Sequence, residues 1–144
     1  PGFGDPDYFD VEDCKTQRNL SYQGRSQSRK IGDLFRLNGI TRAVVYSSQW
    51  CRCMETAKLL ALGEVSILPS LNSFFENFSR EKLQTKQTMD WIKNAPLDIP
   101  TVLVSHQVNI SALTGYSPTS GEIIFLRRSN EGKISVIGSI QTLN

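Results

Sequence analysis

The sequence has few residues that bind metals and no long apolar or basic runs. Its 144 residues include one histidine, three cysteines and no Cys-x-x-Cys pair, so a structural zinc site has almost no ligands to draw on. No apolar segment approaches the roughly 20 residues of a membrane span. There is no run of Lys and Arg and no nucleic-acid-binding signature, and a net charge of +2 indicates neither a nucleic acid nor a membrane-surface partner. We therefore predict no metal, no cofactor, no nucleic acid and no membrane span.

Several catalytic patterns are also absent. A serine hydrolase would carry Gly-x-Ser-x-Gly, which does not occur. Neither common glycine-rich nucleotide loop is present. No cysteine is followed six residues later by an arginine, as a cysteine phosphatase loop requires. These absences leave the single histidine as the main candidate for chemistry.

The three cysteines do not form a familiar framework. Cys51 and Cys53 are separated by one residue, and Cys14 lies far from both. Since this spacing is neither a usual disulfide nor a usual zinc pattern, we interpret all three as free thiols. A bridge from Cys14 to one of the other two stays open in an oxidising compartment, so the compartment is undecided.

The length and composition indicate one domain over residues 1–144. The chain is 39% hydrophobic and 21% charged, as in ordinary globular proteins, and long enough to bury a core. Residues 1–20 are rich in Pro, Gly and Asp and are predicted to be loop-like.

The remaining residues alternate between strand and helix patterns. Ser21 is a suitable N-cap for a helix over 22–37, and Asn38-Gly39 would end it. Further helices are predicted over 50–62, 80–93 and 107–113, and strands over 42–47, 65–68, 101–105, 122–127 and 133–140. This alternation predicts a three-layer α/β/α sandwich with a mostly parallel sheet and an antiparallel edge.

Two predicted strands end in polar residues. Ser48 and Arg52 follow one strand, and His106 and Gln107 follow another. The carboxyl ends of parallel strands lie along one rim of a sheet, so Arg52 and His106 are expected to converge. Guanidinium and imidazolium groups together would bind an anion such as phosphate. The alternatives are a structural histidine and an arginine on a solvated helix face.

Three motifs together resemble the histidine phosphatase superfamily, which has the phosphoglycerate-mutase-like fold. They are Leu20-Ser21-x-x-Gly24-x-x-Gln27, Ser47-Ser48-x-x-x-Arg52-x-x-x-Thr56-Ala57 and Val104-Ser105-His106. Their order and spacing cover nearly the whole chain. The segments 13–20, 50–53 and 120–122 resemble a bacterial subgroup that is often exported, which leaves a periplasmic and a cytoplasmic location open.

The resemblance implies a mechanism and a set of site residues. In the superfamily, a first histidine in an Arg-His-Gly or Arg-His-Ala triplet attacks phosphorus and becomes phosphorylated. The position of Arg52 binds phosphoryl oxygens and that of His106 stabilises the transferring group, with Ser48 and Gln107 as further phosphate-binding candidates. Asn72 stands near the usual place of the proton-donating carboxylate, which makes Glu76 the nearest candidate acid. No metal is needed, because arginine and histidine supply the positive charge.

The sequence departs from the superfamily in having no first histidine. We expect that the natural protein extends upstream and that this chain lacks its first strand and nucleophile. It would then bind a phosphorylated small molecule or phosphoprotein weakly, without turnover. The exposed strand edges predict a homodimer that pairs across the gap or a marginally stable monomer. The alternatives are a non-catalytic phosphate-binding module and a purely structural or interaction domain on the same scaffold.

Overall fold

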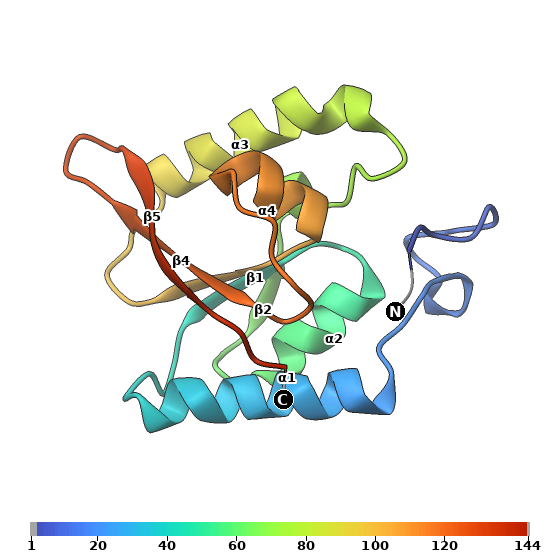
Figure 1. Cartoon of the computed structure of the whole chain (residues 1–144), viewed down its shortest axis with the longest axis horizontal. Helices are drawn as coiled ribbons and strands as arrows, with labels where there is room; N and C mark the ends of the chain where they lie inside the picture. The colour runs from blue at the N-terminus through green and yellow to red at the C-terminus, as the bar shows by residue number, and fades with distance from the viewer. Residues whose placement is uncertain (1–2, 144) are drawn as a thin grey trace.

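The computed structural model describes residues 3–143, which fold into three layers (Figure 1). Strands form the middle layer, α1 and α2 cover one face, and α3 and α4 cover the other. The helices are α1 (Tyr22–Leu37), α2 (Cys51–Leu59), α3 (Glu81–Asn94) and α4 (Gln107–Thr114). The strands are β1 (Val44–Ser47), β2 (Val65–Ile67), β3 (Thr101–Val104), β4 (Ile123–Arg128) and β5 (Ile134–Ile140). The predicted three-layer α/β/α class is confirmed.

Helix α1 begins and ends where its capping residues predict. The Ser21 hydroxyl accepts the Gly24 N–H at 3.1 Å and so satisfies one free donor of the first turn. Helix α2 is shorter than predicted and ends at Leu59 instead of Leu62. The chain turns at Ala61, which has a φ of 51°, and this turn allows both Leu60 and Leu62 to reach the core.

The strands form two separate sheets. β1 lies between β2 and β3 and is parallel to both. β4 and β5 form an antiparallel pair, as the predicted hairpin requires. Among residues 3–143 no strand joins β3 to β4, so the antiparallel edge exists as a sheet of its own. Each sheet therefore has two outer strands, which are β2 and β3 in the parallel sheet and β4 and β5 in the antiparallel one.

The core lies between the parallel sheet and the α1–α2 layer. Its buried members are Ile31, Ala43, Val45, Ala57, Leu60 and Leu62. Gly32 allows the two helices to approach closely, since a Cβ there would stand 2.3 Å from the Leu60 carbonyl oxygen. None of the helices within residues 3–143 is long and apolar enough to cross a membrane.

A side chain of β4 ties the second sheet to the opposite helical layer. Arg128 donates to three carbonyl oxygens at the end of α3, those of Ile92 (2.7 Å), Lys93 (3.1 Å) and Ala95 (2.7 Å). The position of β4 relative to α3 thus depends on a side chain instead of a backbone ladder.

The N-terminal loop is tied down covalently. Cys14 and Cys51 form a disulfide with a Cα–Cα distance of 5.7 Å, which joins the loop to the first residue of α2. The interpretation of three free thiols is therefore wrong for this pair, and only Cys53 is free and buried. Sequence spacing could not choose the partner, because the pairing depends on how the loop folds back onto α2.

Candidate phosphate-binding site

The site lies where two adjacent parallel strands end. Ser47 of β1 is in register with Val104 of β3, and Ser48 donates its N–H to the Val104 carbonyl at 3.0 Å. This pairing places Ser48 beside His106, whose Nε2 lies 2.8 Å from the Ser48 hydroxyl. Arg52, in the first turn of α2, places Nη2 at 3.3 Å from His106 Nδ1. The expected convergence of Arg52 and His106 is therefore present.

The hydrogen bonds assign the protonation of the imidazole. A guanidinium group has only donors, so Nδ1 of His106 accepts from Arg52. The ring proton then lies on Nε2, which donates to the Ser48 hydroxyl. His106 is thus a neutral imidazole held by two neighbours.

Burial explains why this histidine is neutral. Loss of water around the ring, followed by the positive charge of Arg52, lowers the pKa of His106 to about 3, against a smaller opposing effect of Asp5. The expected imidazolium is therefore not the state of the free site. Cys53 lies beside the ring, with Sγ 3.6 Å from Nε2, and burial raises the pKa of its thiol to about 12. Cys53 is accordingly a protonated, unreactive neighbour.

Asp5 from the N-terminal loop binds the arginine of the site. Its Oδ1 lies 3.2 Å from Arg52 Nη1, and its Oδ2 accepts the Trp50 indole N–H at 2.9 Å. A carboxylate thus neutralises part of the charge of the Arg52 guanidinium. Sequence reasoning missed Asp5, and its only signal was the acidic character of the loop.

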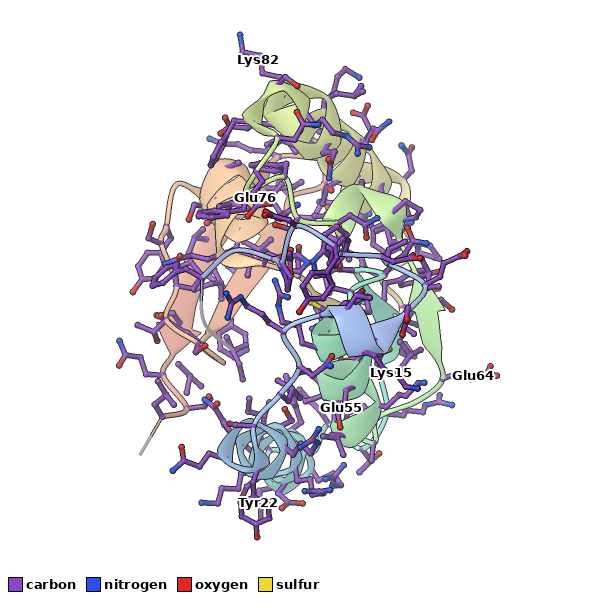
Figure 2. All side chains as sticks on the ribbon, turned by 90° about the vertical axis from the view of Figure 1, so that its right-hand side faces the viewer. Lys15, Tyr22, Glu55, Glu64, Glu76 and Lys82 are labelled. Atoms are coloured by element: carbon purple, nitrogen blue, oxygen red, sulfur yellow. A yellow bond between two sulfur atoms is a disulfide. The ribbon has the colours of Figure 1, made fainter. Side chains whose placement is uncertain are left out.

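Two other predicted site residues, Gln107 and Glu76, form hydrogen bonds with groups other than Arg52 and His106. Gln107 lies beside His106 and donates to the Pro118 carbonyl at 3.2 Å. Glu76 is exposed and lies against the N-terminal loop (Figure 2), where its Oε1 accepts the Asp5 N–H at 3.3 Å. Glu76 therefore reaches the arginine only through Asp5.

Asn72, at the place where a carboxylate was expected, has a structural role. Its side-chain oxygen accepts the Gln49 N–H at 2.8 Å and its amide donates to the Gln49 side-chain oxygen at 2.8 Å. Its carbonyl also accepts from Gln84 and Asn109. Asn72 thus fixes the loop after β1 against α3 and α4.

The described residues define the class of protein at the level of fold. No protein-family model matches the sequence, and no curated protein matches it. Solved structures of histidine phosphatases do match, and the chain has the phosphoglycerate-mutase-like fold of that superfamily. The predicted resemblance is confirmed for the fold.

Three of these structures cover most of the chain. The protein histidine phosphatase SixA, solved with tungstate, is similar with a TM-score of 0.67 and 16% identity, over 87% of this chain and 85% of that one. The Mycobacterium tuberculosis open reading frame Rv3214 gives 0.66 and 14%, over 83% of each chain. A phosphoserine phosphatase mutant from Entamoeba histolytica, in complex with phosphoserine, gives 0.65 and 16%, over 86% and 85%.

Proposed function

We propose that this chain carries the phosphate-binding half of a phosphomonoester hydrolase of the histidine phosphatase type. The observation that carries the proposal is the cluster of Ser48, Arg52 and His106 at two adjacent strand ends. The phosphatase fold of the similar structures, one of them holding phosphoserine, supports the substrate class. A phosphorylated small molecule or a phosphoprotein would bind here.

In this proposal Arg52 is the main ligand of the phosphoryl group. A guanidinium binds two oxygens of a phosphate in a forked geometry. Phosphate would displace Asp5 from Arg52 and add negative charge beside His106. That charge would raise the pKa of His106 and favour a second donor to the phosphate. Ser48 positions the ring. Gln107 and Glu76 lie at the edge of the site, where Gln107 is a further candidate ligand of the phosphate and Glu76 is the candidate proton donor.

The chemical step needs a nucleophile that residues 1–144 do not contain, since His106 is the only histidine. We propose that the phosphohistidine intermediate forms on a histidine outside residues 1–144, and that this 144-residue chain binds phosphate monoesters without turning them over. A second candidate function is a non-catalytic phosphate-binding module, because such a module needs no second histidine as nucleophile.

Binding is tested first, by calorimetric titration with inorganic phosphate. Arg52→Ala should weaken binding by about tenfold or more, as expected for loss of a charge-assisted hydrogen bond. Arg42→Ala is the matched control, because Arg42 is exposed ahead of β1 and should have no effect. Equal binding by wild type and Arg52→Ala would contradict the proposal.

Hydrolysis of p-nitrophenyl phosphate then separates the two candidates. The chain alone should be inactive, and a version extended through its natural upstream sequence should hydrolyse the substrate in a manner that needs Arg52 and His106. Binding without hydrolysis in both versions would favour the module. Turnover by the 144-residue chain itself would show that the superfamily mechanism does not apply.

A further inference from the structure

A small cavity adjoins the candidate phosphate site. It lies between the beginning of α3 and one side of α4, two helices that stand beside each other in Figure 1. Its volume of about 310 Å³ is close to the lower limit of about 300 Å³ for ligand pockets. The lining residues that matter here are Phe74, Phe78, Glu81, Gln107, Val108 and Ser111.

The small cavity is continuous with the surroundings of Arg52 and His106. Phe74, Gln107 and Val108 line both this cavity and the larger one that contains Arg52 and His106. Along α4, Ser111 follows Gln107 by one turn, which is about 6 Å at about 1.5 Å per residue. A ligand whose phosphoryl group lies at Arg52 and His106 can therefore reach the small cavity through a short chain.

One wall of the small cavity is aromatic. Phe78 packs edge-on against Phe74 and Phe75, with ring centroids 6.0 and 6.1 Å apart and interplanar angles of 69° and 63°. Phe74 is buried and anchors this cluster in the protein, whereas Phe78 is 56% exposed. The ring of Phe78 is thus available to a ligand, and the face of an aromatic ring attracts cations.

The other lining groups also suit a cation. Glu81 is exposed and makes no ion pair within residues 3–143, and its sequence neighbours Arg80 and Lys82 do not line the cavity. The helix dipole alone favours a carboxylate in the first turn of α3, so Glu81 indicates a ligand only together with the aromatic wall. Gln107 donates its amide to the Pro118 carbonyl, and its side-chain oxygen can still accept a hydrogen bond.

We propose, on the basis of the proposed function, that the small cavity binds an ammonium group of the substrate, so that the preferred substrates are phosphate monoesters of short amino alcohols. Arg52 binds the anionic end, and the cationic end lies between the ring of Phe78 and the carboxylate of Glu81. A neutral alcohol of the same shape would contact the ring but leave the carboxylate unpaired. An anionic alcohol would be repelled by Glu81.

The test compares two esters of equal shape by calorimetric titration of the 144-residue chain. Phosphocholine carries a quaternary ammonium group, and neohexyl phosphate has a carbon atom in place of its nitrogen. We expect phosphocholine to bind at least about fivefold more tightly, through the cation–π and carboxylate contacts. Equal affinity of the two esters would overturn the proposal.

Variants of the two walls locate the ammonium group. Glu81→Gln should remove the preference for phosphocholine and leave the binding of inorganic phosphate unchanged. Phe78→Leu keeps an apolar side chain without a ring, so it should weaken phosphocholine more than neohexyl phosphate. Glu64→Gln, which changes an exposed carboxylate just before β2, is the matched control and should keep the preference. An unchanged preference in Glu81→Gln and Phe78→Leu would contradict the proposal.

Choline without phosphate separates this proposal from the proposed function. In NMR spectra of the wild type it should shift the amide signals of Val108 and Ser111, which line the small cavity. Such shifts without any binding of inorganic phosphate would support the ammonium site and contradict the proposed function. Binding of phosphate that depends on Arg52, with no shift from choline and no preference for phosphocholine, would overturn the ammonium site alone.

Discussion

At the scale of single residues, the main feature of the site is that two neighbours share the guanidinium group of Arg52. Asp5 occupies one side of the guanidinium and His106 the other, and both contacts are largely shielded from solvent. A partly buried arginine needs partners, and here these are a carboxylate and a neutral ring. Under the proposed function, a phosphate that binds Arg52 has to displace the Asp5 carboxylate.

Replacing Asp5 should strengthen phosphate binding. Asp5→Asn removes the competing charge while keeping the shape and an acceptor for the Trp50 indole. A partly buried ion pair is worth about 1 kcal/mol or more, which corresponds to at least about fivefold tighter binding of inorganic phosphate in a calorimetric titration. Asp7→Asn, on the exposed part of the same loop, is the control. Weaker binding by Asp5→Asn would mean that the carboxylate supports the site.

The pKa of His106 should be directly measurable, because its imidazole is the only one in the sequence. In an NMR titration of the free protein the ring should titrate far below 6.5, towards about 3. Saturation with phosphate should raise this pKa, since the anion neutralises Arg52. A free-protein pKa near 6.5 would contradict the buried, neutral state.

The same shift should make folding sensitive to acid. A histidine with a lowered pKa binds its proton more readily in the unfolded chain, so stability is retained above pH 6.5 and decreases as the pH falls from 6.5 towards 3. Urea unfolding at pH 5 should show a loss of about 1 to 2 kcal/mol relative to pH 7.5. His106→Asn should lack this part of the pH dependence. An equal acid response in the two proteins would assign it to other groups.

At the scale of elements, the sequence predicted features that depend on local patterns better than features that depend on long-range contacts. The limits of α1 follow from Ser21 at its start and Asn38-Gly39 at its end, both of which act within a few residues. The meeting of Arg52 and His106 also follows from sequence, because parallel strands align their carboxyl ends. The Asp5 contact and the Cys14–Cys51 pairing could not be predicted, since both depend on how an irregular loop packs on α2.

The disulfide should contribute substantially to stability. It closes a loop across a sequence separation of 37, and constraining the unfolded chain by such a loop is worth about 3 to 4 kcal/mol in the chain-entropy model. Reduction should lower the urea midpoint and also loosen the contact of Asp5 with Arg52. Cys53→Ser, measured without reductant, serves as the control that retains the bridge. An unchanged midpoint after verified reduction would show that the loop is already constrained without it.

At the scale of the whole molecule, two sheets stand beside one another without a shared ladder. A gap with a cavity of about 1040 Å³ lies between β3 and β4. The order of strands alone could not give the volume or the lining of this gap, because both depend on how α1 and α3 approach it.

The unpaired edges of β3 and β4 at the gap should make the 144-residue chain a marginally stable monomer. The gap is lined by residues of α1 and α3 as well as by β3 and β4, so a second folded copy would not fit its own strand edge into it. Light scattering after size exclusion should therefore give a monomer mass, and urea unfolding a stability at or below the low end of about 5 kcal/mol for native domains. A stable monomer or a tight dimer would each contradict this expectation.

Arg128 has a consequence for the tolerance of the protein to sequence change. It recognises carbonyl oxygens at the end of α3, and every amino acid carries that oxygen. In a saturation library scored for folded protein, Lys93, whose side chain is exposed, should accept most substitutions, whereas Arg128 should accept almost none. Two residues in direct contact would thus show opposite mutational freedom, and co-variation between them would be absent.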